Sequence, residues 1–353
     1  MTQPPHPTPA APRPPTQDPD RRATRLAAID SEIRALGDQS LRQQLQPLVT
    51  WTENVFGDHG PFAIIKRKTG RFRLPRALKT ELMDRFVEAN GSPATQLTTM
   101  IVVAHPDDES IGAGARLNRL GNAWIVEMTD GAPNDLECAR RHGFDTREQY
   151  AEARRRELDH AMTIAGFPLH RLISLGYTDG EVTLRLAEAC LRITEWIDTL
   201  RPDIVLTHPY EGGHTDHDAT AFAVHLACGA LRREGVTPPA ILELALYNAQ
   251  KGRKVLQRFL PHERADRDQR VIRLSASERA AKRRIFGAFE TQKSVLDHFS
   301  LEFERFRPAP RYIFTAPPHA GQLNYERYGD PNRGRNWREH AERVLRGLGM
   351  RRD

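Results

Sequence analysis

The sequence predicts an α/β fold, with a Rossmann-like, mostly parallel sheet that carries helices on both faces. Between residues 98 and 233, short apolar runs alternate with stretches of helical periodicity. Two of the runs, residues 100–104 and 204–206, lead directly into clusters of His and Asp. Alternating strands and helices are typical of parallel sheets, and open sheets bind ligands beyond the carboxyl ends of their strands. We therefore expect the two clusters to meet at one edge of the sheet.

The expected elements follow in chain order. Strands are expected at residues 98–104, 123–128, 171–175, 203–207, 241–246 and 271–274. Helices are expected at residues 110–120, 146–165, 183–200, 219–233, 277–299 and 338–348. Gly166 closes the second of these helices, and Gly112 and Gly114 let the first one lie close to the sheet.

Four regions are expected: a disordered Pro-rich tail at 1–20, a helical extension at 21–97, the main domain at 98–320 and a C-terminal tail at 321–353 with a short helix. The first region has too little apolar surface to fold and no apolar segment of a secretory signal. In the extension, helical spacing covers residues 25–55 and 76–89. The extension has no ligand cluster, so we expect it to pack on the main domain, shape its cleft or support oligomers.

The composition limits the partners and the compartment. A net charge of +6 and a pI near 9.4 favour anionic partners, but the basic residues are scattered among acids and accompany no nucleic-acid-binding motif. Nucleic acid is therefore not an expected partner, and no apolar run is long enough to span a membrane. Three widely spaced cysteines, Cys138, Cys190 and Cys228, suit the reducing cytoplasm. The oligomeric state stays open, with a homo-oligomer among the alternatives.

The two polar clusters have the composition of a metal site for hydrolysis. His105 and Asp108 are three residues apart, as are His214 and His217, and this spacing points both side chains of a pair the same way on a first helical turn. Zinc takes imidazole nitrogens and carboxylate oxygens, and a catalytic site leaves one position for water. We assign His105, Asp108 and His217 as ligands of zinc, although iron(II) could take the same ligands in a cell.

The remaining polar residues suit the chemistry around the metal. Asp107 lies between two ligands and is free to act as the general base, while His214 could stabilise the oxyanion or protonate the leaving amine. Asp130 and Asp179 end strands on the same side of the sheet, where they could orient ligands or bind sugar hydroxyls. The alternative is a structural one, because acidic residues before a helix often cap it and favour its dipole.

The motifs resemble those of the LmbE-like, or PIG-L, de-N-acetylase family. The first motif is Ala104-His105-Pro106-Asp107-Asp108-Glu109, and the second runs from His208 to Asp218. The resemblance covers roughly residues 98–250 and implies zinc-dependent hydrolysis of an N-acetyl group. By matching position it places zinc on His105, Asp108 and His217, the base on Asp107 and transition-state stabilisation on His214. It also implies that Arg154 contacts the substrate, where a surface ion pair with Glu157 is the structural alternative.

One departure concerns the donor to the oxyanion. Some deacetylases of this family carry a tyrosine two residues before the second-motif histidine, where this chain has Gly212. Tyr210 is near in sequence but would need a different loop path. His208 is expected to shape the loop rather than to touch the substrate.

The expected function is removal of an N-acetyl group from an N-acetylglucosamine-containing or related small molecule by metal-activated water. One alternative keeps the chemistry and changes the substrate to an N-acyl group on an antibiotic or another secondary metabolite. A second alternative is a binding protein of the same fold without turnover. Asp107 argues against that alternative, since a non-catalytic relative has no need of a base beside the ligands.

Overall fold

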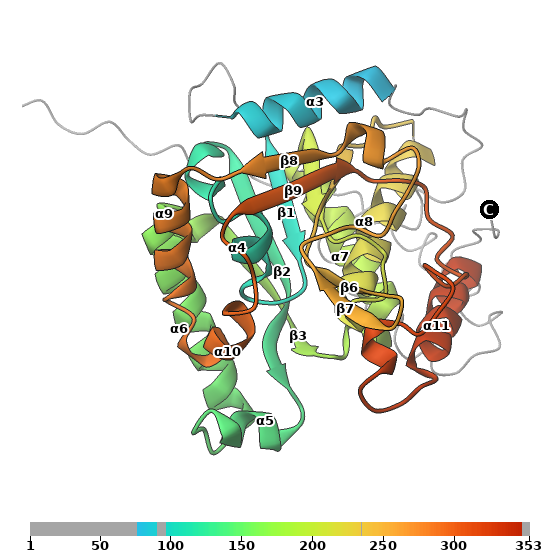
Figure 1. Cartoon of the computed structure of the whole chain (residues 1–353). Helices are drawn as coiled ribbons and strands as arrows, with labels where there is room; N and C mark the ends of the chain where they lie inside the picture. The colour runs from blue at the N-terminus through green and yellow to red at the C-terminus, as the bar shows by residue number, and fades with distance from the viewer. Residues whose placement is uncertain (1–75, 90–96, 234, 348–353) are drawn as a thin grey trace, which may run out of the picture. The chain divides into compact units, whose positions relative to one another are not determined.

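The computed structural model describes residues 76–89, 97–233 and 235–347 and contains a mostly parallel seven-stranded sheet (Figure 1). Along the sheet the order is β3 (Leu172–Asp179), β2 (Ala123–Pro133), β1 (Thr99–Val103), β4 (Ile204–Thr207), β5 (Ala240–Leu244), β9 (Phe303–Pro308) and β8 (Arg270–Arg273). The pairs from β3 to β5 are all parallel, and the two last strands are antiparallel. The expected fold class is therefore confirmed.

The helices lie on both sides of this sheet (Figure 1). They are α3 (Arg76–Glu88), α4 (Asp108–Ala113), α5 (Leu136–Arg141), α6 (Arg147–Ala165), α7 (Leu186–Leu200), α8 (Thr215–Arg233), α9 (Ala276–Phe286), α10 (Lys293–Leu296) and α11 (Arg333–Gly347). Helix α6 packs on α9 on one side, and α7 packs on α8 on the other. No helix within the described ranges has the length and apolarity needed to cross a membrane.

Local sequence signals explain where the long helices begin and end. Helix α6 starts with a capping box between Thr146 and Gln149, and it ends at Gly166, whose φ of 70° is easily adopted only by glycine. Every residue of β1 is buried, as expected for a central strand covered on both faces. In α3, Met83 and Phe86 are fully buried in the same core, and Phe86 packs edge-on against Phe306 of β9.

Several boundaries differ from the prediction. Strands β2 and β3 continue to Pro133 and Asp179, beyond the expected ends at 128 and 175. Helix α8 begins at Thr215 instead of residue 219, which places the second polar cluster in its first turn. The helix expected at 277–299 is broken after Phe286 into α9 and α10. The expected tail at 1–20 and the helical stretch at 25–55 lie outside the described residues.

Three strands were not predicted. Strand β9 adds the antiparallel edge, and the hairpin of β6 (Tyr247–Gln250) and β7 (Arg253–Leu256) forms a separate two-stranded sheet. The segment assigned to a C-terminal tail contains α11, whose Trp337 is buried and donates its indole N–H to the carbonyl of Thr215 at 3.1 Å. This segment therefore packs against the start of α8.

Candidate metal centre and active site

Strand pairing brings the two polar clusters together. Strands β1 and β4 are parallel neighbours, with Thr99 paired to Ile204 and Val102 to Thr207, so the loops after them leave the same edge of the sheet. The backbone N–H of Ala104, after β1, donates to Nε2 of His208, after β4, at 2.9 Å. The sequence prediction that the two motifs converge is therefore correct.

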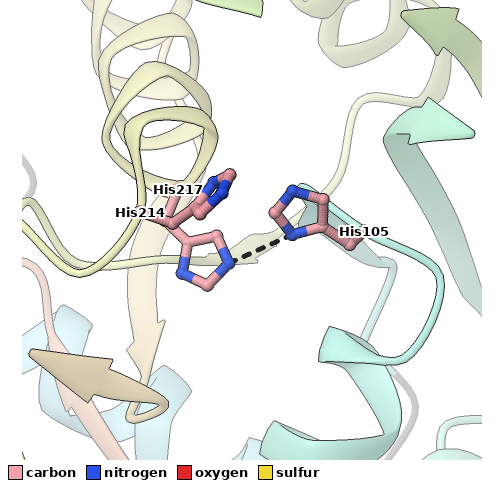
Figure 2. Close-up of side chains that lie close together, drawn as sticks. All are labelled: His105, His214 and His217. Atoms are coloured by element: carbon pink, nitrogen blue, oxygen red, sulfur yellow. Dashed lines mark hydrogen bonds between the residues drawn. The ribbon is translucent and has the colours of Figure 1, made fainter. Parts of the chain in front are cut away.

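Three side-chain atoms from the two motifs form a nearly equilateral triangle. His105 Nδ1 lies 3.2 Å from Asp108 Oδ2 and 3.2 Å from His217 Nε2, and His217 Nε2 lies 3.3 Å from Asp108 Oδ2. Figure 2 shows His105 facing His214 and His217 across this space. All three side chains of the triangle are buried.

This triangle fits three ligands of one metal ion. Zinc binds imidazole nitrogen and carboxylate oxygen at about 2.0–2.2 Å, so at tetrahedral angles the donor atoms lie about 3.3–3.5 Å apart. The triangle has nearly this size without further movement. The electrostatic surroundings of the triangle also favour a cation. Burial disfavours the charged imidazole of His105, but Asp179 and Asp108 outweigh burial and raise the pKa of His105 well above its ordinary value.

Carboxylates behind His105 fix its orientation. Its second nitrogen, Nε2, lies 3.1 Å from Asp179 Oδ1 and 3.4 Å from Asp216 Oδ2. Asp216 is itself held by the backbone N–H groups of Gly180 and Val182, at 2.6 and 3.2 Å. Metal-bound histidines usually turn their other nitrogen to a carboxylate in this way. Asp179 therefore lies at the site, as expected from the sequence, whereas the role of Asp216 was not predicted.

Other donor atoms lie close enough to form alternative metal sets. The first set is His105, His214 and His217. The second is His105, Asp179, His214 and Asp216. The third is Asp108, His208 and His217. In the third set, His208 Nε2 already accepts the N–H of Ala104, so its lone pair is taken. His208 instead stacks on His217, with ring centres 4.0 Å apart, which agrees with the expected structural role.

Asp107 occupies a strained turn between His105 and Asp108, the two members of the triangle from the first motif. Its φ of 155° and ψ of −23° are unfavourable for a residue with a side chain. Its backbone N–H donates to the carbonyl of His105 at 2.9 Å and to Glu109 Oε2 at 3.1 Å. Burial raises the pKa of Asp107 to about 7, although Arg154 acts against this shift. A carboxyl that titrates near neutrality is suited to general-base chemistry.

Arg154 contacts the first motif directly. Its Nη2 lies 3.1 Å from Asp107 Oδ2 and 2.8 Å from the carbonyl oxygen of Pro106. Its Nη1 lies 3.3 Å from the carbonyl oxygen of Gly131. The expected alternative, an ion pair with Glu157, does not describe this arginine, because Glu157 accepts from the N–H and hydroxyl of Thr291.

His214 directly precedes helix α8 and faces the imidazoles of His105 and His217 (Figure 2). Its Nδ1 accepts the backbone N–H of Asp216 at 3.2 Å, which leaves the hydrogen of a neutral ring on Nε2. Burial and the neighbouring His105 lower its pKa, so the neutral form is favoured. The ring stands edge-on to that of His105, with centres 4.7 Å apart. His214 therefore presents an N–H donor beside the triangle.

The remaining expected site residues differ in their surroundings. Asp130 forms an ion pair with Arg147 and accepts the N–H of Ala132 at 3.0 Å. Tyr210 donates its hydroxyl to the carbonyl of Ala316 at 2.8 Å and packs on Trp337, so it does not replace the tyrosine donor. At Gly212, with φ +70°, an added Cβ would lie 2.7 Å from Leu323, so a tyrosine does not fit there either.

Tyr247 is a residue at the site that the sequence reasoning missed. Its ring centre lies 5.0 Å from that of His217. Burial raises its pKa, and the charges of His105 and Asp108 reach its hydroxyl group. Tyr247 is the first residue of β6, and the sequence around it contains no recognisable motif, so only the tertiary structure identifies it.

Comparison with known proteins gives an independent view of the two motifs. Residues 100–228 match the family model described as GlcNAc-PI de-N-acetylase, PIG-L. The chain is 33% identical over 164 residues to 1D-myo-inositol 2-acetamido-2-deoxy-alpha-D-glucopyranoside deacetylase of Kineococcus radiotolerans, covering 37% of this chain and 45% of that protein. It is 31% identical over 140 residues to probable N-acetyl-alpha-D-glucosaminyl L-malate deacetylase 2 of Bacillus subtilis, covering 38% and 62%. The chain thus spans about half the length of the curated relatives it matches.

Among solved structures, the chain resembles the A40926 pseudoaglycone deacetylase Dbv21, with 20% identity and a TM-score of 0.46 over 62% of this chain and 98% of that one. It also resembles N,N'-diacetylchitobiose deacetylase from Pyrococcus horikoshii, with 20% identity and a TM-score of 0.42 over 69% and 95%.

Proposed function

We propose that the protein, whose residues 100–228 match the PIG-L family model, is a zinc-dependent N-deacetylase. Its substrate is an N-acetylglucosamine-containing or related small molecule, the class after which both curated relatives are named. The observation that carries the proposal is the donor triangle of His105, Asp108 and His217, with Asp107 and His214 beside it and outside the ligand set.

The proposed zinc ligands are His105 Nδ1, Asp108 Oδ2 and His217 Nε2. When bound, zinc supplies Lewis acidity, which acidifies water and polarises a carbonyl. The two imidazoles and one carboxylate leave one charge of a divalent cation uncompensated. Asp179 and Asp216 supply further negative charge behind His105.

Asp107 is the proposed general base. Its carboxylate takes a proton from the attacking water as the new C–O bond forms at the acetyl carbon. When the C–N bond breaks, the same carboxyl returns the proton to the amine nitrogen, so acetate and a primary amine leave and Asp107 is again ionised. Arg154 acts on the substrate through Asp107, because it holds that side chain and the carbonyl of Pro106.

His214 is the proposed donor to the oxyanion. Its Nε2–H can donate to the carbonyl oxygen as negative charge develops there. Protonating the amine instead would need a hydrogen on both nitrogens, which would break the bond that Nδ1 accepts from Asp216. This geometry favours the first of the two roles expected from the sequence. Of Asp130 and Asp179, Asp179 is the better placed to meet a sugar hydroxyl, because it lies 3.1 Å from His105 Nε2 whereas Asp130 is paired with Arg147.

The proposal is tested by a substrate screen with the purified, zinc-loaded protein. N-acetylglucosamine, its methyl glycoside and other N-acetylated amino sugars are offered, and free acetate and primary amine are both measured. Equal release of both products from an amino sugar is expected. Asp107→Asn serves as the matched control, because it keeps the shape of the side chain and removes the base. Bound zinc without any turnover across the screen would instead identify a binding protein.

A further inference from the structure

Three consecutive residues of the C-terminal region contact the loop that leads to His214. They are Leu323, Asn324 and Tyr325, and the last two begin a short helical turn. All three are buried. They lie outside residues 100–228, the part of the chain that matches the family model, so neither motif points to them.

Leu323 and Asn324 enclose the two glycines at the end of this loop. The backbone N–H of Asn324 donates to the carbonyl of Gly212 at 2.8 Å, and its side-chain amide donates to the carbonyl of Gly213 at 3.0 Å. An added Cβ would lie 2.7 Å from Leu323 at Gly212, and 2.2 Å from the carbonyl oxygen of Tyr247 at Gly213. Glycine is otherwise the residue with the freest backbone, so these contacts decide where the loop ends.

Tyr325 contacts the same loop through Asp218 of α8. Its hydroxyl donates to Asp218 Oδ2 at 3.1 Å. Asp218 Oδ1 accepts the backbone N–H groups of Glu211 and Gly212 at 3.2 and 3.1 Å. The backbone N–H of Asp218 donates to the carbonyl of His214 at 3.1 Å. Asp218 therefore ties the loop to the first turn of α8, and Tyr325 holds Asp218.

The backbone of this turn decides where the imidazole of His214 points. Its Nδ1 accepts the N–H of Asp216 at 3.2 Å, so the ring is fixed to its own turn. The Nε2–H group, which the proposed function assigns to the oxyanion, therefore moves with the backbone of residues 212–218. A displacement of about 1 Å at a catalytic group can reduce a rate by about 100-fold.

We propose that Asn324 and Tyr325 are positioning residues that aim His214 at the reacting carbonyl. The inference rests on the proposed deacetylase function and adds the C-terminal region to the residues that the reaction needs. His217 lies inside α8, where the hydrogen bonds of the helix itself hold it. Loss of either contact is therefore expected to spare the bound zinc.

The test measures kcat, KM and bound zinc in Asn324→Leu and Tyr325→Phe, with an N-acetylated amino sugar that the wild type hydrolyses. Leu fills the space of the amide without its donor, and Phe lacks only the hydroxyl. We expect kcat to fall by about 10-fold or more in each variant, with little change in KM or zinc content, because the oxyanion contact strengthens only as charge develops. Urea unfolding confirms that each variant is folded in the assay. A wild-type kcat in both variants would overturn the proposal.

Combining each substitution with His214→Ala separates positioning from a general effect on the fold. If Asn324 and Tyr325 act through His214, neither substitution should lower kcat further once the imidazole is gone. The same fold-loss in the His214→Ala protein as in the wild type would show that these residues do not act through His214.

Gln322→Leu and Tyr328→Phe are the matched controls. Both residues are exposed neighbours of the pair, and the side chain of Gln322 donates to the carbonyl of Glu326 at 3.2 Å within the same turn. Both variants should keep the wild-type kcat. An equal loss in the controls would overturn the assignment to Asn324 and Tyr325.

Hydrogen exchange, read by mass spectrometry, separates this inference from the proposed function because it needs no turnover. In the zinc-loaded variants, peptides covering residues 208–218 should exchange faster than in the wild type, whereas peptides from β1 should not. Faster exchange confined to this loop, with no hydrolysis of any amino sugar by the wild type, would support the contact and contradict the deacetylase function. Hydrolysis by the wild type, with unchanged exchange and kcat in both variants, would support the function and overturn the inference.

Discussion

The guanidinium group of Arg154 donates both to the side chain of Asp107 and to the backbone carbonyl of Pro106. One nitrogen, Nη2, lies 3.1 Å from Asp107 Oδ2 and 2.8 Å from the carbonyl oxygen of Pro106, the residue before it. Asp107 needs such support because its φ of 155° is unfavourable. Arg154 thus acts on the charge of the base and on the shape of the turn that carries it.

Replacing Arg154 with Met is predicted to shift the acid limb of the pH profile upward. Burial raises the pKa of Asp107 and Arg154 lowers it, so the variant loses the lowering influence. The base acts as a carboxylate, so activity falls as the pH drops through this pKa. A higher pKa therefore removes activity at a higher pH. We expect kcat/KM of the zinc-loaded variant at pH 7 to fall by about 5-fold or more, because raising a pKa of about 7 by one unit lowers the ionised fraction from about one half to about one eleventh.

The control for this prediction is Arg155→Met on the same helix. Arg155 is paired with Asp159 on the surface and should leave the profile unchanged. A profile of Arg154→Met that superimposes on that of the wild type would mean that Arg154 does not control the ionisation of Asp107.

Zinc binding is predicted to need all three members of the triangle. His105→Ala, Asp108→Ala and His217→Ala each remove one donor, and coordination by two protein ligands is weak. Elemental analysis after dialysis should show a sharp fall in bound zinc in each variant. His208→Gln is the matched control, since the single lone pair of His208 Nε2 is used by Ala104. Retention of zinc in all three Ala variants would assign the metal to another set of donors.

His214→Ala is predicted to lower kcat by about 10² to 10³ with little change in KM, because a contact to the oxyanion strengthens only as charge develops. The zinc content should stay near that of the wild type, which separates this variant from the three above. Loss of zinc from His214→Ala, with activity regained at high zinc, would make His214 a ligand.

The convergence of the two motifs followed from local signals in the sequence. Both clusters come after short apolar runs, and the parallel order of β1 and β4 places their ends together. The triangle could be expected because His105 and Asp108 are three residues apart in the first motif, and His217 has the same spacing from His214 in the second. Asp179 was expected to orient ligands or bind sugar hydroxyls, but its pairing with His105 and the role of Asp216 were not predicted, because both carboxylates reach this ring from β3 and α8 through the fold.

Strand β9 was missed because it carries charges that tertiary contacts neutralise. Strand β9 contains Glu304 and Arg307, both buried, and this polar pattern resembles that of a loop. Glu304 is paired with Lys282, and Arg307 with Glu211 and Glu243, all from distant segments. No local rule predicts such partners, since their separation along the chain is large.

Gly213→Ala is predicted to displace the hairpin of β6 and β7. The added Cβ would lie 2.2 Å from the carbonyl oxygen of Tyr247, which belongs to the backbone and cannot rotate away. We expect a loss of stability of about 1–3 kcal/mol in urea unfolding, the usual range for overpacking, together with reduced activity. Gly287→Ala is the control, because there the nearest neighbour, the carbonyl oxygen of Arg284, is 3.4 Å from the added Cβ. Equal stability of the two variants would show that the loop adjusts freely.

Removing the ammonium group of Lys282 is predicted to destabilise the fold. Lys282, on α9, donates from Nζ to Glu304 Oε1 and to the carbonyl of Ile111, both at 2.8 Å, and neither side chain of the ion pair is exposed. Lys282→Met leaves the carboxylate of Glu304 buried with a weaker partner, Arg116, whose Nε lies 3.7 Å from its Oε2. We expect the free energy of unfolding to fall by about 3–5 kcal/mol, the usual effect of breaking a buried ion pair.

Two further variants separate the charge of Lys282 from its packing. Replacing both partners, as Lys282→Met with Glu304→Leu, should recover much of the loss, because no buried charge is then left without its main partner. Arg119→Ala breaks the ion pair with Glu278 at the surface and should cost about 0–1 kcal/mol. If the double variant is no more stable than Lys282→Met in urea unfolding, the role of Lys282 is packing of its aliphatic chain rather than neutralisation of Glu304.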